Sequence, residues 1–313
     1  MDWLARAPRG YARGGTSATV TGLNLEILAY ILCGLAGLGA GWVANIVANR
    51  FPIEERALFA PLRCMKGGEP LHWYDHFPVF GFLLQKGVCR HCGKKLPLRF
   101  PLLELLLVAC FVTAWARFQN APLYIYAVSV FYITLMVVVG AIDLRHRLIF
   151  PAMIYLGCLV AILTGILSGA HPDGFLPDGI GSGILGALFC GITFQLLYWL
   201  AIAIYRVRAL GFGDVLLAAL MGFILGFPGS VAALFMGAVL NGIAAGLVML
   251  LGKKGRREFI PYGTTLCLAT MLTIMFGESV WRWGPLGILT DLLGLLFEII
   301  FRFMLNILGV QAS

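Results

Sequence analysis

Apolar residues occur along this chain in eight long runs that are separated by shorter polar segments. Most of these runs approach the roughly 20 residues that an α-helix needs to cross the hydrocarbon core of a bilayer. Apolar strands in soluble parallel-sheet enzymes are much shorter, at about 4–8 residues. Because backbone N–H and C=O groups in lipid must be satisfied internally, the runs predict membrane-spanning helices. We place these helices at about 24–47, 101–118, 122–141, 149–168, 180–205, 213–227, 229–251 and 262–277.

The two ends of the chain depart from this pattern. The N-terminal tail, 1–23, is polar and Arg-bearing, and we interpret the apolar run after it as a retained span rather than a cleaved signal peptide. At the other end, the extension 278–313 contains an apolar run that Glu298 and Arg302 interrupt at i, i+4 spacing. This extension is either a ninth span or a helix that lies in the membrane interface.

Composition supports a membrane protein and changes the meaning of the net charge. Hydrophobic residues make up 60% of the chain and charged residues only 12%, whereas an ordinary soluble domain has about 25% charged residues. The net charge of +8 would suggest nucleic acid in a soluble protein. In a membrane protein, basic residues collect in cytoplasmic loops instead. The expected fold is therefore an all-α polytopic membrane protein that contacts the lipid bilayer and no nucleic acid.

Basic residues mark one side of the predicted bundle. They cluster at 145–147, 206–208 and 253–257, while the intervening connections at 119–120, 171–178 and 228–230 contain no Lys or Arg. The positive-inside rule places the basic connections in the cytoplasm. The same alternation places the polar segment 48–100 there as a cytoplasmic loop domain, followed by a seven-helix core at 101–277.

Two carboxyls lie at this basic side. Asp143 follows the end of the run at 122–141, and Asp214 lies at the start of the run at 213–227, just after Gly211 and Gly213. Acids at the ends of membrane spans are rare and are often functional. Two facing carboxyls share a proton, so one can deprotonate water while the other donates to a scissile carbonyl. The pattern indicates an aspartic peptidase site.

Simpler explanations exist for each carboxyl. Asp143 can pair with Arg145 or Arg147 at the membrane surface, and Asp214 can cap the helix that it begins. Other hydrolase classes lack their signatures, because the chain contains neither a Gly-x-Ser-x-Gly nor a His-Glu-x-x-His motif.

Five motifs follow one another between residues 34 and 277. In this order they resemble the motifs of type IV prepilin peptidases, which are membrane aspartic proteases of the Gly-x-Gly-Asp class. The motifs are 41–52, 86–105 with its Cys-x-x-Cys pair, Asp143 before a short polar turn and Pro151, 211–214, and 260–263 with Pro261 and Gly263.

The resemblance implies a specific activity. Members of this family remove the leader peptide of type IV prepilins and pseudopilins at the cytoplasmic face of the bacterial inner membrane. Asp143 and Asp214 match the two catalytic aspartates, and the peptidase step needs no cofactor. Many members also methylate the new N-terminus with S-adenosylmethionine.

The sequence departs from the family pattern at two places. Cys64, Cys89 and Cys92 stand at positions of two Cys-x-x-Cys pairs, but Gly67 occupies the fourth position. A structural zinc site needs four ligands, so either the metal has been lost or one of His72, His76 and His91 completes the set. In addition, Leu216 stands where a lysine is common, which leaves the titration of the two aspartates open.

Two further questions concern the substrate and the class of protein. Glu54 and Glu55 directly follow the first span, where they either attract a basic leader or merely offset Arg50 and Arg56. Two rival functions are an inactive member that only binds pilin-like helices or assembly proteins, and a proton-coupled transporter. Acids gathered on one face, without broken inverted-repeat helices, argue against the transporter.

Overall fold

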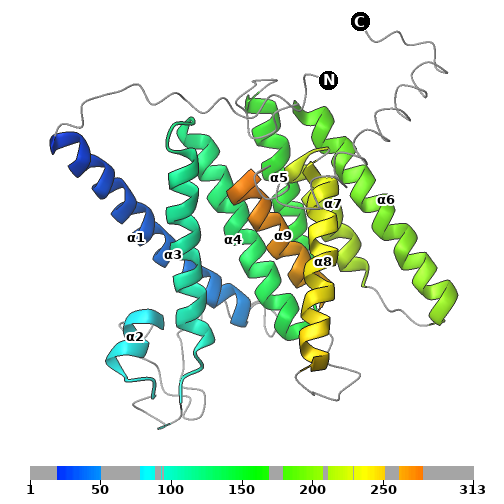
Figure 1. The fold of residues 1–313 in the computed structure, drawn as a ribbon, viewed down its shortest axis with the longest axis horizontal. Coiled ribbons are helices and arrows are strands. Elements are labelled where there is room, and N and C mark those ends of the chain that lie inside the picture. Colours follow the sequence, from blue (N-terminus) through cyan, green and yellow to red (C-terminus); the bar gives the residue numbers. More distant parts are fainter. Residues whose placement is uncertain are drawn as a thin grey trace, which may run out of the picture.

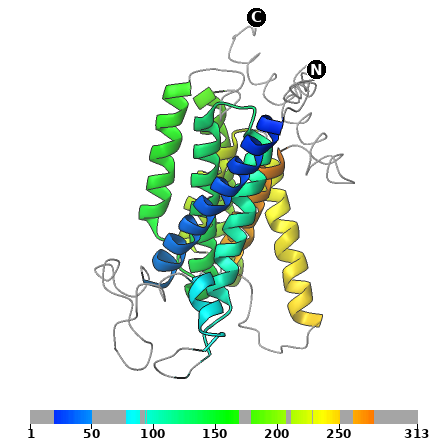
Figure 2. The same cartoon turned by 90° about the vertical axis from the view of Figure 1, so that its left-hand side faces the viewer.

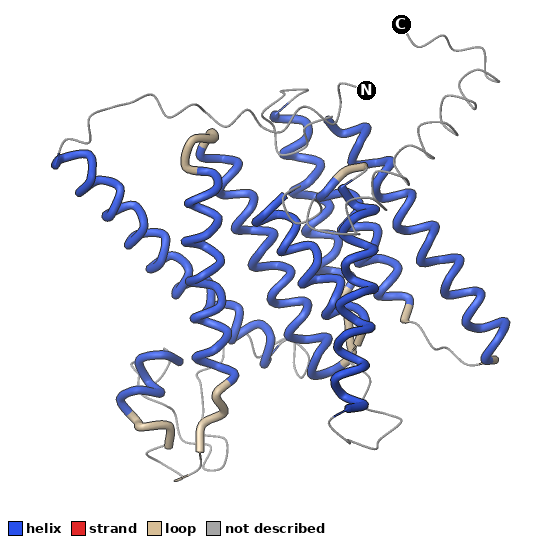
Figure 3. Tube along the Cα trace, viewed as in Figure 1, coloured by secondary structure: helices blue, strands red, loops and turns tan. Residues whose placement is uncertain are grey.

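The protein is a bundle of α-helices. The computed structural model describes residues 20–50, 78–88, 93, 95–168, 179–206, 211–227, 229–250 and 261–277, and every regular element within these ranges is a helix (Figure 3). The expectation of an all-α membrane protein is confirmed at this level. The helices are α1 (Val20–Arg50), α2 (Pro78–Leu84), α3 (Arg99–Phe118), α4 (Leu123–His146), α5 (Pro151–Ser168), α6 (Gly179–Tyr205), α7 (Phe212–Leu225), α8 (Gly229–Leu250) and α9 (Tyr262–Phe276).

Each of the eight predicted runs coincides with one of these helices, but their lengths differ. Five helices, α1, α3, α4, α6 and α8, are long and apolar enough to cross a membrane. The apolar helices α5, α7 and α9 are shorter. With its 14 residues, α7 is only about 21 Å long at 1.5 Å per residue. Short α2 lies within the segment that we expected to form a loop domain.

The short helices α7 and α9 lie inside the bundle. Helix α4 contacts α1, α3, α5 and α9, while α9 also contacts α7 and α8. Figure 1 shows α1 and α3 on one side of α4 and α9, with α6 at the opposite edge. Seen from that first side, α1 crosses α3 obliquely (Figure 2). The core is therefore built around α4, α7 and α9.

Glycines allow the closest helix crossings. A methyl group on Gly186 in α6 would meet the backbone of Gly222 in α7, and a methyl group on Gly222 would meet the backbone of Gly186. At the α1–α3 crossing, a methyl group on Gly41 would lie 2.7 Å from the Cα atom of Glu104. Lipid supplies no hydrophobic force between helices, so close backbone packing of this kind holds them together. The α6–α7 crossing fixes the helix that begins with Asp214.

Large apolar side chains cover the outward faces of the outer helices. Leu28 and Leu35 on α1, and Leu196 and Leu200 on α6, are each more than half exposed. Patches of this kind would be unusual on a soluble monomer. They are the expected surface of helices that contact lipid.

Candidate active site

Two carboxyls from separate helices meet at one end of the bundle. Asp143 lies in the last turn of α4 and is 3% exposed, while Asp214 lies in the first turn of α7 and is half-buried. The two side chains are close enough for their charges to repel each other. The structure therefore brings together two residues that are 71 positions apart in the sequence.

The carboxyl of Asp143 lies at the beginning of α9. The Thr264 hydroxyl lies 3.0 Å from Oδ2 of Asp143 and within hydrogen-bonding geometry. A methyl group on Gly263 would come 2.7 Å from the same oxygen. Both residues belong to the first turn of α9, where backbone N–H groups lack partners within the helix and the positive end of the helix dipole lies. This helix end stabilises a negative charge on Asp143, whereas burial of the carboxyl opposes that charge.

Asp214 lies at the beginning of its own helix. The backbone N–H of Gly211 donates to Oδ2 of Asp214 at 3.2 Å, and the N–H of Asp214 donates to the Gly211 carbonyl at 3.1 Å. The capping role considered for Asp214 is thus realised through Oδ2. Among the described residues no hydrogen bond involves Oδ1, so capping does not use the whole carboxyl. Both aspartates face the positive end of a helix.

The arginines after Asp143 have different partners. Arg145 donates through Nη1 to the Asn49 side chain in α1 and not to Asp143. Arg147 has a positive φ of 54°, and its N–H donates to the Asp143 carbonyl at 2.8 Å, which closes the end of α4. Its charge lies near the Asp143 carboxyl. The proposed pairing of Asp143 with Arg145 is therefore wrong, while Arg147 remains a neighbour.

One apolar side chain joins the glycines of two motifs. Ile149, in the connection between α4 and α5, would lie 2.8 Å from a methyl group on Gly213 and 3.0 Å from one on Gly263. The motifs at 211–214 and 260–263 therefore meet at this side chain, with Pro261 at the N-cap of α9. Sequence reasoning missed both Ile149 and Thr264. Thr264 follows the motif at 260–263 directly, whereas nothing in the sequence distinguishes Ile149 from other apolar residues.

Several predicted site residues fall outside the described residues. Within the described residues, no three His, Cys, Asp or Glu side chains come close enough to hold a metal ion. The predicted site residues that lie outside the described ranges are the leader candidates Glu54 and Glu55, the cysteines Cys64, Cys89 and Cys92 with Gly67, and the candidate ligands His72, His76 and His91.

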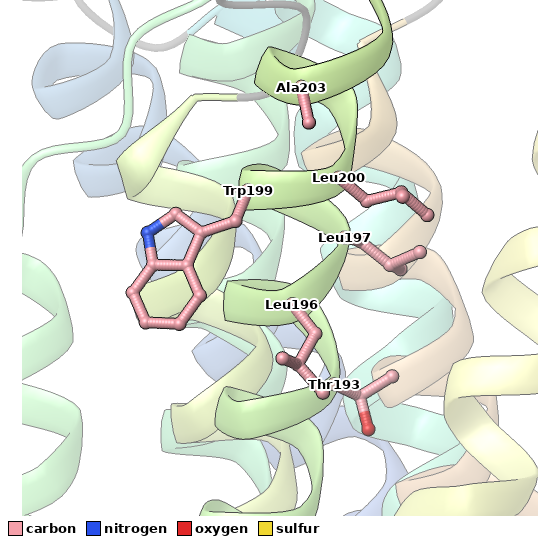
Figure 4. A pocket seen from close by; sticks show the side chains of 6 residues that line it. All are labelled: Thr193, Leu196, Leu197, Trp199, Leu200 and Ala203. Carbon is pink, nitrogen blue, oxygen red and sulfur yellow. The ribbon is translucent and has the colours of Figure 1, made fainter.

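An open groove lies on α6. Thr193, Leu196, Leu197, Trp199, Leu200 and Ala203 line it (Figure 4). Its side chains are apolar apart from the Thr193 hydroxyl and the Trp199 N–H, and the hydroxyl already donates to the Phe189 carbonyl at 2.7 Å. S-adenosylmethionine carries several charged and polar groups that need placed partners. The groove does not fit this methyl donor and is better suited to lipid chains.

Sequence comparisons identify the family. The Bacterial Peptidase A24 N-terminal domain matches residues 35–118, and the Type IV leader peptidase family matches residues 130–247. A prepilin leader peptidase/N-methyltransferase of Klebsiella pneumoniae is 31% identical over 199 residues, which cover 62% of this chain and 83% of that protein. This chain belongs to the type IV leader peptidase family.

Other members of the family are similar over comparable lengths. A prepilin leader peptidase/N-methyltransferase of Myxococcus xanthus is 29% identical over 223 residues, 71% of this chain and 64% of that protein. One from Bacillus subtilis is 27% identical over 203 residues, 65% of this chain and 76% of that protein. No solved structure gives a significant match. The segment matched to the leader peptidase family contains both Asp143 and Asp214, whereas Thr264 lies beyond it.

Proposed function

We propose that this chain is an aspartic endopeptidase that removes the leader peptide of type IV prepilins and pseudopilins, with Asp143 and Asp214 as its catalytic carboxyls. The observation that carries the proposal is the placement of Asp143 and Asp214 at one end of the bundle. Gly263, beside Oδ2 of Asp143, and Gly213, which directly precedes Asp214, both lie against the Ile149 side chain. Membership of the type IV leader peptidase family supports the substrate class.

The chemistry follows from the shared proton. Two carboxyls at close range hold one negative charge and one proton between them. The ionised carboxyl removes a proton from water as its oxygen attacks the scissile carbonyl, and the protonated carboxyl donates to the carbonyl oxygen. When the tetrahedral intermediate collapses, the C–N bond breaks and the leaving amine takes up a proton. The positive helix ends of α7 and α9 stabilise the single charge of the pair.

The position of the pair supports a membrane-boundary reaction. We place the chain in the bacterial inner membrane with eight spans, the short helices α5, α7 and α9 included, and the carboxyls on the cytoplasmic side. Arg145, Arg147 and Arg206 lie at the helix ends on that side, in agreement with the positive-inside rule. A precursor would keep its apolar helix in lipid while its scissile bond reached the pair.

A second step on the new N-terminus belongs to the same proposal. The names of the Klebsiella and Myxococcus relatives include N-methyltransferase. We propose that this chain also methylates the new N-terminal amine, with S-adenosylmethionine as donor. The apolar groove on α6 has no part in that step.

The decisive experiment uses isosteric variants of both carboxyls. Asp143→Asn and Asp214→Asn should each reduce cleavage of a prepilin by at least about 10³-fold, because loss of either catalytic carboxyl removes a proton-transfer group. Mass spectrometry of the pilin N-terminus reports cleavage and methylation together, and thermal unfolding in detergent checks the fold. Near-normal turnover by either variant would exclude the two-carboxyl mechanism. Binding of prepilin without cleavage by the wild-type chain would favour the inactive binding protein.

A further inference from the structure

Thr264 differs from the other threonines of its helix. Thr265, Thr270 and Thr273 each donate to a backbone carbonyl three or four residues earlier in α9, at 2.8 Å. This back-bonding is the usual arrangement for threonine in a helix. The Thr264 hydroxyl instead reaches α4, where Oδ2 of Asp143 lies at 3.0 Å and the Gly140 carbonyl at 3.3 Å.

The two partners of this hydroxyl have different hydrogen-bonding capacities. A backbone carbonyl only accepts, whereas a carboxyl accepts when it is ionised and can donate when it is protonated. When Asp143 is ionised, the Thr264 hydroxyl can donate to Oδ2. When Asp143 is protonated, its O–H can donate to the threonine oxygen while the hydroxyl proton turns to the Gly140 carbonyl. In both protonation states Oδ2 of Asp143 can thus keep a hydrogen bond to Thr264 without movement of heavy atoms.

We propose that Thr264 is a positioning residue for Asp143, whose hydroxyl reverses its donor direction as the catalytic proton enters and leaves that carboxyl. The inference rests on the proposed peptidase function. Buried polar groups without partners are costly, and Asp143 is 3% exposed. A fixed donor alone would favour one protonation state and oppose the other, whereas a hydroxyl with a second acceptor serves both.

The surroundings of Asp143 leave this role to Thr264. Among the residues that the structure describes, the ionisable groups that face Asp143 are Asp214 from α7, Arg147 after α4 and the Cys267 thiol from α9. Arginine only donates, and the second aspartate is the proton-sharing partner itself. Gly263 packs against Oδ2 of Asp143 and limits the positions open to that oxygen. The carboxyl is therefore held within hydrogen-bonding distance of the Thr264 hydroxyl, which can donate to it or accept from it as its protonation state changes.

The test compares three variants of the full-length chain in detergent with a purified prepilin. Thr264→Val removes the hydroxyl and keeps the shape, Thr264→Ser keeps the hydroxyl, and Thr265→Val removes a hydroxyl that bonds only to its own helix. We measure kcat and KM across pH. Removing one placed donor from an active site costs on the order of 10²-fold in kcat, so we expect Thr264→Val to lose about that much with little change in KM.

The pH profile separates this role from a merely structural one. Both forms of Asp143 lose a partner without the hydroxyl, but a hydrogen bond to the ionised carboxylate is stronger than one to the neutral acid. The acidic limb of the Thr264→Val profile should therefore move to higher pH. Thr264→Ser and Thr265→Val should both show the pH profile of the wild type. If Thr264→Val does not fold, Thr264→Ala provides the comparison without a hydroxyl.

Three outcomes would overturn the proposal. They are an unshifted profile in the variant that lacks the hydroxyl, an equal loss of kcat in Thr265→Val, and failure of Thr264→Ser to restore activity. Failure of the proposed function is distinguishable, because then either the wild-type chain would leave the prepilin uncut or Asp143→Asn would still cleave it. An inactive Asp143→Asn beside a fully active Thr264→Val would reject only the role of Thr264.

Discussion

Asn49 in α1 accepts a hydrogen bond from the guanidinium of Arg145, which stands two residues after Asp143. The Asn49 amide donates in turn to the Asn45 carbonyl at 2.6 Å, and the buried Asn45 side chain donates to the Phe100 carbonyl in α3 at 3.0 Å. These hydrogen bonds through Phe100, Asn45, Asn49 and Arg145 form a polar ladder that connects α3, α1 and the end of α4. It ties the segment matched to the N-terminal domain to the helix that carries Asp143.

Breaking the ladder should loosen this connection without removing a catalytic group. Asn49→Ala should lower the free energy of unfolding by about 1–2 kcal/mol, because it removes both the hydrogen bond from Arg145 and the one to the Asn45 carbonyl. Thermal unfolding in detergent measures the change. In a double-mutant cycle with Arg145→Ala, the two losses should not add, since both variants remove the same bond. Additive losses would show that the two side chains act independently.

Gly263→Ala should inactivate the peptidase while leaving the fold largely intact. The added methyl group would lie 2.7 Å from Oδ2 of Asp143, so the Asp143 carboxyl must move from its position beside Thr264. Small misplacements of catalytic groups can cost about 10²-fold in rate. Gly246→Ala in α8 is the matched control, because a methyl group there has no neighbour within 4 Å. Equal cleavage rates for the two variants would contradict the geometry described for Asp143.

Gly222→Ala should test the crossing of α6 and α7. A methyl group at this position would meet the backbone of Gly186, and no side-chain rotation can relieve that contact. Overpacking of this kind typically costs about 1–3 kcal/mol. We expect a lower unfolding temperature in detergent and a smaller loss for Gly181→Ala, where a methyl group meets nothing within 4 Å. A Gly222→Ala protein as stable as wild type would show that α6 and α7 can separate freely.

Glu54 and Glu55 remain candidates for recognition of the basic leader. The paired change Glu54→Gln with Glu55→Gln should raise KM for a precursor with a basic leader, because two attracting charges are lost. Added salt should weaken the attraction in the wild type, since charges are screened over about 8 Å at physiological ionic strength. A precursor with a neutralised leader is the control. An equal rise in KM for both precursors would mean that these acids do not read the leader.

Much of the fold could be predicted from the sequence, because apolar runs and polar breaks determine which segments lie in lipid. The ends of the runs placed Asp143 and Asp214 at the same side, and the two carboxyls do lie at one end of the bundle, where α9 contacts both of the helices that carry them. Periodicity could not predict that Arg145 binds Asn49, because hydropathy does not specify which face of α1 meets α4. Nor could it find Thr264 and Ile149, whose roles depend on how α9 and the connection after α4 pack around the two carboxyls.

Cys267 offers a natural reporter for opening of this site. Its thiol is 2% exposed, packs beside Gly140 of α4 and lies near both aspartates. A maleimide can reach it only when the helices packed around α9 open, so the alkylation rate at this one residue measures how often that opening occurs. Mass spectrometry of the Cys267 peptide would read that frequency in the unmodified enzyme. The same reading with a precursor bound would tell whether substrate entry opens the bundle or leaves it closed.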